Sequence, residues 1–208
     1  MEILVDDERY ARLGPPDQTI GELANEVTQA SKAAGQRIVV SICCDGEPVA
    51  SEQLEATLEA PSGRFQRVEL QTQSVAALVR ATLDQAILLT EDSDATRQQA
   101  ADLLAEGRHD QAMQELQKFC DVWKQVQRTL LVSAQALGLS LDTIRADDLG
   151  LAEVLDLVKT QLAGLKDAME KGDLVLVGDI LRYEFDEPLA HWVAILKQLR
   201  ENAQTADG

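Results

Sequence analysis

The sequence predicts an α+β protein in which a small N-terminal sheet, residues 1–72, precedes a C-terminal bundle of four or five helices, residues 73–208. In the first region, short runs rich in β-branched residues alternate with turn-forming Gly, Pro and Asp. From residue 73 onward, apolar residues recur at steps of three and four, the period of packed helices. The chain has 208 residues, of which 45% are hydrophobic, so it can bury one large core or two small ones. The last few residues are expected to form a short disordered tail.

The sheet region begins with two short strand candidates, residues 2–6 and 9–13, joined by a tight acidic turn. A helix is predicted next, because Thr19 and Glu22 match a capping box, in which each side chain bonds the backbone N–H of the other residue. Gly35 suits the end of this helix. The residues expected to face the core follow helical spacing: Ile20, Leu23, Val27, Ala30 and Ala34.

Three further strands complete the predicted sheet. Residues 37–44 are rich in β-branched residues and run into Asp45-Gly46, a pair that favours a type I′ turn because both positions need a positive φ. Residues 47–50 form the return strand. A short helical piece, residues 51–59, then leads to the last strand, residues 64–72.

This order of elements (strand, strand, helix, strand, short strand, helical turn, strand) resembles the β-grasp fold of ubiquitin-like proteins. The resemblance covers about the first third of the chain and rests on the element order and the helix of residues 19–35. Ubiquitin-like modifiers and sulfur carriers act through a free C-terminal Gly-Gly, whereas this sheet continues into helices and the sequence ends in TADG. The resemblance therefore implies a docking or structural role for the sheet.

The helical region is predicted to start with two helices, residues 74–89 and 94–107. A longer helix follows and ends at Gly138, with apolar residues at alternating steps of four and three, the spacing of a helix packed along its neighbours. Its seam comprises Ala112, Leu116, Phe119, Trp123, Val126, Leu130, Ser133 and Leu137. After the connecting residues 139–150, a second seam comprises Leu151, Leu155, Val158, Leu162, Leu165 and Met169, before a stop at Gly172.

The last helix is predicted to run from its N-cap, Asp173, to about Asn202, with a kink or restart near Asp186 because Pro188 lacks an N–H. Arg182 is expected to pair with Asp186 one turn later. Tyr183 and Trp192 are interpreted as residues at the edge of the core. The apolar stripe of this helix comprises Leu174, Val177, Leu181, Phe185, Trp192, Ile195 or Leu196, and Leu199, widened by Leu176, Ile180, Tyr183 and Ala190.

Residues 170–192 contain six carboxylates and His191, which raises the question of a catalytic or metal-binding cluster. A di-iron bundle needs two Glu-x-x-His repeats and two further glutamates. Glu187 and His191 are four residues apart, and a glycine turn separates Glu106 from His109. The stretch is therefore interpreted as a solvent-exposed helix face, with no metal, cofactor or catalytic residue assigned. The acids expected to face water include Asp179, Glu184 and Asp186.

The cysteines and the motif search suggest no chemistry. The sequence contains no P-loop, no Rossmann glycine fingerprint, no Gly-x-Ser-x-Gly and no Cys-x-x-Cys. Cys43 and Cys44 are neighbours in the strand of residues 37–44, so one faces the core and the other faces outward. Together with Cys120 they are interpreted as free structural thiols in a reducing cytoplasm. Cys44 is the expected buried thiol, because it shares a strand face with Ile38, Val40 and Ile42.

The charge of the chain excludes two classes of partner. With 19 Lys and Arg against 36 Asp and Glu, the formal charge is −17, the wrong sign for binding nucleic acid or an anionic membrane surface. The segment MEILVDDERY lacks the basic and apolar regions of a signal peptide, and no stretch approaches the ~20 apolar residues of a spanning helix. A cytoplasmic location is expected, where the acidity either maintains solubility or attracts a basic protein.

Three functions remain open at this stage. The first is a non-enzymatic protein-binding protein (an adaptor, regulator or chaperone-like module), because helical bundles offer grooves to partner helices. The second is an enzyme with a carboxylate-based site between sheet and bundle. The third is a homo-oligomeric scaffold, such as a homodimer, in which a second chain completes the helical seams. The absence of a catalytic motif favours the first.

Overall fold

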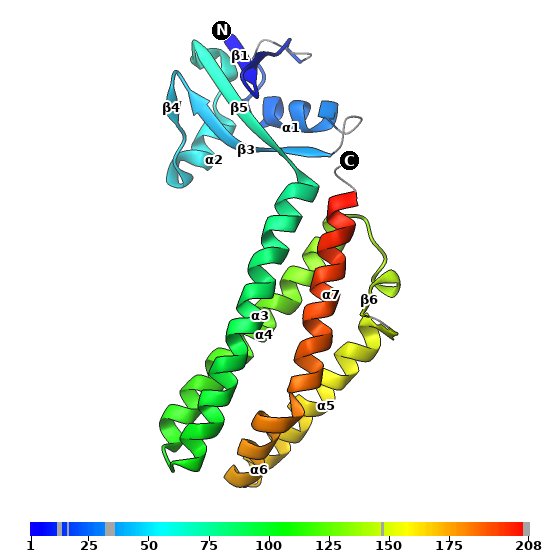
Figure 1. The fold of residues 1–208 in the computed structure, drawn as a ribbon. Coiled ribbons are helices and arrows are strands. Elements are labelled where there is room, and N and C mark those ends of the chain that lie inside the picture. Colours follow the sequence, from blue (N-terminus) through cyan, green and yellow to red (C-terminus); the bar gives the residue numbers. More distant parts are fainter. Residues whose placement is uncertain (12–13, 16, 32–35, 147, 206–208) are drawn as a thin grey trace. The chain divides into compact units, whose positions relative to one another are not determined.

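The structure is a computed structural model that describes residues 1–11, 14–15, 17–31, 36–146 and 148–205. The chain divides into two compact units, Met1–Leu78 and Val79–Ala206. The first unit contains a mixed sheet and the second consists mainly of helices, which confirms the predicted α+β class (Figure 1). The described residues form seven α-helices, more than the four or five predicted for the bundle alone, because two of the seven belong to the first unit.

Five short strands form the sheet of the first unit: β1 (Glu2–Val5), β2 (Glu8–Arg9), β3 (Arg37–Cys44), β4 (Glu47–Pro48) and β5 (Arg67–Ser74). Their order is β2-β1-β5-β3-β4. Strands β1 and β5 pair in parallel, and the other neighbours pair antiparallel. The last strand in the sequence therefore lies at the centre of the sheet, so that the sheet is complete only when both ends of this unit have come together.

Helix α1 (Ile20–Ala30) supplies the helical side of the core of this unit. Its predicted capping box is present: the Glu22 N–H donates to Thr19 Oγ1 (3.2 Å), and the Thr19 N–H donates to Glu22 Oε2 (2.8 Å). Ala30, which was expected to face the core, is exposed, and the predicted helix end at Gly35 lies outside the described residues. The buried cluster that joins this helix to the strands comprises Ile3, Ile20, Leu23, Val27, Ile42, Cys44, Val68 and Leu70.

The other predicted elements of the first unit differ from the structure only at their ends. Helix α2 (Ser51–Glu59) forms where predicted, and the type I′ geometry is present, with φ of 54° at Asp45 and 87° at Gly46. Strand β5 starts three residues later than predicted, because residues 62–64 form a 3-10 turn. The prediction of a strand over residues 9–13 is wrong at its end: β2 has two residues, and residues 12–13 lie outside the described part of the chain.

A bulge in β3 overturns one prediction about which side chains face the core. The pairing of β3 with β5 shifts between Val39 and Ser41, so Val40 has no opposite residue. An extra residue reverses the inward and outward alternation on one side of a bulge. Val39 therefore packs against the core together with Ile42 and Cys44, whereas Ile38 and Val40, predicted to share their face, are exposed.

The second unit is built on three long helices and one interrupted helix. Two of the long helices end beside a glycine that was predicted to stop them. Gly138 follows α4 with a φ of 65°, and Gly172 follows α5 with a φ of 71°. The boundary between the two units falls inside the first turn of α3, which begins directly after β5. The helices are α3 (Val75–Ala105), α4 (His109–Ala136), α5 (Leu151–Glu170), α6 (Leu174–Asp179) and α7 (Asp186–Thr205).

Helix α3 is one continuous helix, so the prediction of two helices over residues 74–89 and 94–107 is wrong. The polar residues between those two ranges do not interrupt it, because they satisfy their hydroxyls within the helix. Thr90 Oγ1 donates to the Ala86 carbonyl and Ser93 Oγ donates to the Thr90 carbonyl, both at 2.7 Å. Hydroxyl bonds of this kind are tolerated inside a helix that contains neither Gly nor Pro.

The restart predicted near Asp186, within the helix of residues 173–202, is confirmed, because α7 begins at Asp186. Asp173 caps α6 as predicted, since its carboxylate accepts the Leu176 N–H at 3.0 Å. A π-helical segment (Ile180–Glu184) then precedes α7. Each π turn adds a residue and rotates the side chains that follow it. The predicted apolar stripe is wrong at its edges, because Leu176, Tyr183 and Ala190 are exposed, although Ile180 is buried. The π segment accounts for Tyr183 and Ala190, which lie in it or after it, but not for Leu176, which precedes it.

The connection between α4 and α5 contains a small hairpin that the sequence did not reveal. Strands β6 (Arg145–Ala146) and β7 (Leu149–Gly150) pair antiparallel, and Ile144 beside them is fully buried. Strands of two residues are too short to show an alternating pattern, so this region was expected to be a plain connection.

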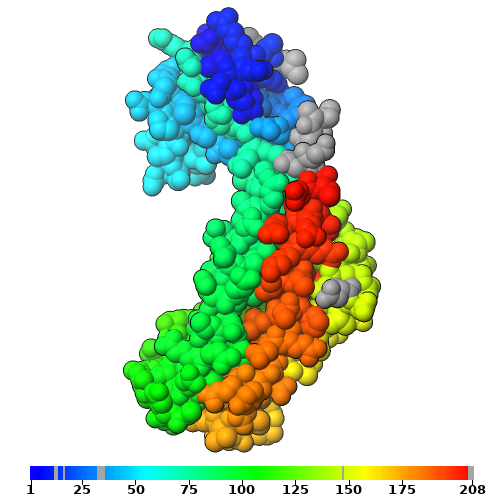
Figure 2. Space-filling view, viewed as in Figure 1, coloured from blue at the N-terminus to red at the C-terminus, as the bar shows by residue number. Residues whose placement is uncertain are grey.

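Helix α7 lies along α3 within the second unit (Figures 1 and 2). Ion pairs join the two helices at three levels: Arg97 with Asp186, Lys197 with Glu91 at 3.7 Å, and Arg200 with Asp84 at 3.1 Å. Between these levels the fully buried side chains of α7 include Ile195, Leu196 and Leu199. The buried residues and these ion pairs together define how α7 packs along α3.

Candidate functional site

The second unit contains a groove with a volume of about 200 Å³, which we call the α4–α5 groove. Helices α4 and α5 each supply four of its residues, and Trp192 of α7 supplies the ninth. Six of the nine side chains are aromatic, aliphatic or thiol groups, and two of these six are tryptophans. The full lining is Cys120, Trp123, Lys124, Gln127, Leu155, Val158, Lys159, Leu162 and Trp192.

The floor of the groove is an aromatic ladder. The Trp123 and Trp192 rings have centroids 5.3 Å apart, and Phe119 meets Trp123 edge-on at 6.2 Å and Phe185 edge-on at 5.3 Å. Trp192 is 1% exposed and Trp123 is 7% exposed. Edge-on ring pairs are favourable beyond their buried area, so these contacts stabilise the packing of the floor. Neither indole N–H has a hydrogen-bond partner among the described residues.

The walls of the groove include leucines that the rest of the unit does not cover. The predicted seam of α5 is correct for Leu151, Val158 and Leu165, which are buried, but wrong for Leu155 and Leu162, which are only half-buried, and for the exposed Met169. The buried line of α5 instead includes Val154 and Ala168. The apolar face of this helix is thus wider than the surface with which α7 and the π segment cover it.

Two lysines are the charged residues that line the groove. Lys124 Nζ lies 3.0 Å from Asp121 Oδ1, and Lys159 Nζ lies 3.2 Å from Asp156 Oδ1, each partner being three residues earlier on the same helix. The hydrogen bond from Lys124 to Asp121, with the attraction of the two charges, raises the pKa of Lys124. The Lys124 ammonium group therefore remains charged at neutral pH. Neither aspartate is itself part of the lining.

Cys120 stands at the edge of the same groove as a half-buried free thiol. Desolvation by burial raises its pKa, against a smaller opposing effect from Lys124. A thiol with a raised pKa is protonated at neutral pH and is a weak nucleophile. Cys120 therefore fits a packing role in the wall better than a catalytic one. Burial likewise raises the pKa of Cys44, which lies in the sheet core as predicted.

A buried arginine, which the sequence analysis missed, organises the break between α6 and α7. Arg97 of α3 is fully buried and donates to the Leu181 carbonyl in the π segment and to the carboxylates of Asp94 and Asp186. The sequence did contain a signal: Arg97 continues the three-to-four spacing of Thr90 and Ser93, so a line of polar residues occupies a core-facing position of α3. All of its contacts are internal, so this cluster stabilises the fold.

The six acidic residues of the stretch 170–192 are all exposed in the structure. Asp186 pairs with Arg97, and Arg182 pairs with Asp102 rather than with Asp186, so that predicted pair is wrong. The Glu187 carboxylate lies 3.5 Å from His191 Nε2. Asp179 and Glu184 are exposed. No group of three or more His, Cys, Asp or Glu side chains in the described chain is arranged to hold a metal ion.

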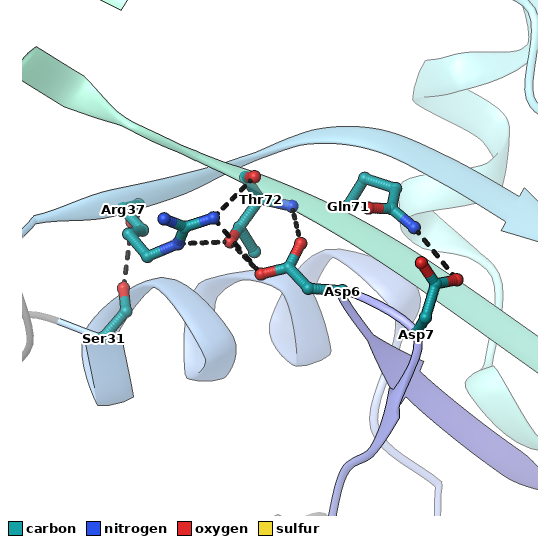
Figure 3. A network of polar contacts seen from close by, with 6 residues as sticks. All are labelled: Asp6, Asp7, Ser31, Arg37, Gln71 and Thr72. Carbon is teal, nitrogen blue, oxygen red and sulfur yellow. Dashed lines mark hydrogen bonds and ion pairs between the residues drawn. The ribbon is translucent and has the colours of Figure 1, made fainter. Parts of the chain in front are cut away.

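A polar network of the first unit is centred on Asp6 at the β1–β2 turn (Figure 3). The Asp6 carboxylate accepts from the Thr72 N–H at 2.7 Å, from the Thr72 hydroxyl at 2.6 Å and from Arg37 at 3.4 Å. Partial burial alone would raise the pKa of Asp6, but the bonds from Thr72 and Arg37 together lower it. Arg37 also donates to the Thr72 carbonyl and hydroxyl. The network thus ties the β1–β2 turn to β3 and β5, as a structural clamp.

Fold and groove together define a two-unit α+β protein whose helical unit carries an open apolar groove. A family model described as "Domain of unknown function (DUF8042)" matches residues 82–195, which is more than half of the chain. The chain therefore belongs to this family. The matched range includes every residue of the α4–α5 groove as well as Arg97. Comparisons with curated proteins and with solved structures give no match. Among the described helices, none combines the length and the apolar character needed to cross a bilayer.

Proposed function

We propose that this chain is a non-enzymatic, cytoplasmic protein-binding protein, and that the α4–α5 groove receives apolar anchor side chains of its partner. The observation that carries the proposal is the preformed aromatic floor with half-exposed leucine walls. Interfaces gain most of their energy from a few anchors that fill well-packed apolar pockets, often lined by Trp.

The size of the groove supports a protein partner over a small substrate. Small-molecule sites commonly enclose roughly 300–1,000 Å³. The groove measures about 200 Å³, which suits one or two side chains presented by a larger surface. Its lining also lacks a carboxylate, a histidine and a hydroxyl group, and the Cys120 thiol is protonated at neutral pH.

The two leucines supply a driving force for association. Leu155 and Leu162 keep part of their side chains in water in the isolated chain. Covering apolar area yields about 25 cal/mol per Å², so that completing the burial of two leucines contributes on the order of 1–2 kcal/mol in addition to the anchor itself. A groove that is already shaped adds the advantage that little conformational freedom is lost on binding.

For the first unit we propose a β-grasp-like sheet with a docking or structural role. The support is the element order, which runs strand, strand, helix, strand, short strand, helix and strand, together with the sheet order β2-β1-β5-β3-β4. The Asp6 clamp joins the first turn of this unit to its last strand, so the sheet is internally secured.

Site-specific photo-crosslinking tests the proposed function. A benzoylphenylalanine residue is placed at Leu162 in the groove or at Val132, an apolar residue of α4 that is 57% exposed and does not line the groove. After irradiation of the cells that express the chain, we expect protein adducts from position 162 and none of the same mass from position 132. An added Leu155→Asp substitution should abolish these adducts. Identical adducts at both positions, or none at position 162, would contradict the proposal.

A further inference from the structure

The two walls of the groove repeat the same pattern. On α4 the lining residues are Cys120, Trp123, Lys124 and Gln127, and on α5 they are Leu155, Val158, Lys159 and Leu162. Both sets follow the spacing i, i+3, i+4, i+7, and in both the lysine holds position i+4. Each wall thus presents a straight stripe two turns long, about 10 Å, with a cation near its middle.

A stripe of this spacing on each of two helices is the surface that a third helix occupies. Residues at i, i+3, i+4 and i+7 form the seam through which helices pack, and charged residues beside the seam select the partner. An extended strand would instead require an open sheet edge for its backbone hydrogen bonds, and helical walls do not offer one.

The charged residues that line the groove favour a partner segment with negative charge. The chain as a whole carries a formal charge of −17, yet the groove is lined by two lysines and no acid. Their present partners, Asp121 and Asp156, are exposed. Exposed pairs of this kind contribute only about 0–1 kcal/mol, so that a carboxylate delivered by a partner can join or replace them at little cost. The long-range repulsion from the acidic chain is screened within about 8–10 Å at physiological salt.

We propose, building on the function proposed above, that the partner segment is an amphipathic helix whose apolar anchors lie over Trp123 and Trp192 and whose flanking carboxylates pair with Lys124 and Lys159. The partner is thus an acidic helix, selected by the two local cations, and not a basic protein attracted by the overall charge. The groove discriminates between these classes because like charges placed beside a lysine are repelled.

The two tryptophans provide the readout. The chain contains two Trp residues, and both line the groove, so their emission reports its occupancy. Three tryptophan-free synthetic helices carry the same leucine stripe and differ only in the flanking residues, which are all Glu, all Gln or all Lys. Each is titrated into the full chain at physiological salt. We expect the Glu helix to bind tightest, with a Kd at least about tenfold below that of the Lys helix.

Charge reversal supplies the matched control. The double variant Lys124→Glu, Lys159→Glu should invert the order of the three peptides. The control Lys118→Glu, Lys166→Glu changes one lysine of each helix that also has a nearby acidic partner on its own helix but does not line the groove, and it should preserve the order. Circular dichroism confirms that the variants are folded.

The outcomes separate this inference from the function on which it rests. If the Gln helix binds but the Glu helix binds no better than the Lys helix, the acidic partner is overturned and a groove for protein anchors stands. If the Lys helix binds tightest, the partner is basic and the inference is wrong. If no helix changes the tryptophan emission, both the inference and the proposed function are overturned.

Discussion

Two regions of the helical unit differ in which side chains they bury: the Arg97 cluster buries a charge, whereas the α4–α5 groove leaves apolar side chains partly exposed. Arg97 is a fully buried cation, and its guanidinium is directed at Asp94, Asp186 and the Leu181 carbonyl, all within the chain. In the α4–α5 groove, apolar leucines stay half-exposed beside lysines at the surface. A buried charge without internal partners would destabilise the fold, whereas an open apolar stripe gains energy only when something covers it. The first place therefore serves the fold, and the second is available for binding.

Removing the partners of Arg97 should produce the largest effect. The double variant Asp94→Asn, Asp186→Asn leaves a buried guanidinium without a counter-charge, which typically lowers the free energy of unfolding by about 3–5 kcal/mol. Urea unfolding followed by tryptophan emission measures this, because both tryptophans belong to the helical unit. Asp102→Asn, which removes the exposed partner of Arg182, is the control and should change stability by less than about 1 kcal/mol. Equal losses of stability in the double variant and in Asp102→Asn would show that the partners of Arg97 stabilise the fold no more than an exposed ion pair does.

Substituting two leucines of α5 by alanine compares its buried side, which includes Leu165, with its groove side, which includes Leu162. Leu165 is buried at 3% exposure, so Leu165→Ala should lower the free energy of unfolding by about 2–5 kcal/mol. Leu162 is half-buried in the groove, and Leu162→Ala should lower it by roughly 1 kcal/mol. The effect on binding of the Glu helix should have the opposite order. Among variants that remain folded, Leu162→Ala should weaken binding relative to wild type more than Leu165→Ala does. A loss of stability at Leu162 as large as at Leu165 would mean that the groove is part of the core.

The sheet unit provides an intermediate case, since Asp6 is partly exposed and yet has only internal partners. Its folded pKa is lowered, so its charge contributes stability above about pH 4, the usual Asp pKa, and this contribution is lost as the pH falls through the folded pKa. Asp6→Asn should lower stability by about 1 kcal/mol at pH 7 and by less at pH 3. Hydrogen exchange of the β1 and β5 amides measures the effect. Asp7→Asn, which loses one contact to Gln71 at 3.5 Å, should have little effect at either pH.

The reactivity of Cys120 tests how far the wall of the groove is shielded from water, and the expected effect is smaller than those above. Because burial raises its pKa, its thiolate fraction at pH 7 is below that of a free cysteine, and alkylation by iodoacetamide should accelerate only at higher pH than for a model peptide thiol. Mass spectrometry of the Cys120 peptide across pH 7 to 10 gives the profile. A profile equal to that of the free thiol would show that the wall of the groove is open to water to a larger extent than its packing indicates.

The sequence predicts the framework of this molecule well, because the framework depends on local signals. Neighbouring residues alone predict the capping box at Thr19, the glycines at Gly138 and Gly172 and the seam of α4 from Ala112 to Ser133. Leu137, the last predicted member of that seam, is only half-buried. The groove, in contrast, depends on how much of the apolar face of α5 the other helices cover, which neighbouring residues in the sequence do not determine. Leu155 and Leu162 satisfy the same spacing as their buried neighbours, so spacing alone cannot separate them.

The remaining differences also arise from contacts between distant residues. The course of α7 depends on Arg97 reaching Leu181 and Asp186 from another helix, and the π segment there shifts Tyr183 into solvent. The bulge at Val40 lies in the pairing of β3 with β5, and the regular alternation assumed for the β3 sequence does not reveal it. Trp192 was placed at the edge of the core from its amphipathic character, but packing against Trp123 buries it in the floor of the groove.

The most direct test of whether the groove is a binding site is the protection of Cys120 from alkylation in extracts of the cells that express the chain. The half-buried Cys43 of the sheet unit serves as the internal reference. If a partner occupies the groove, Cys120 should react at least several-fold more slowly in the extract than in the purified chain, while Cys43 changes little, and the Lys124→Glu, Lys159→Glu variant should lose this protection. Equal Cys120 rates in the extract and in the purified chain would contradict the binding role of the groove.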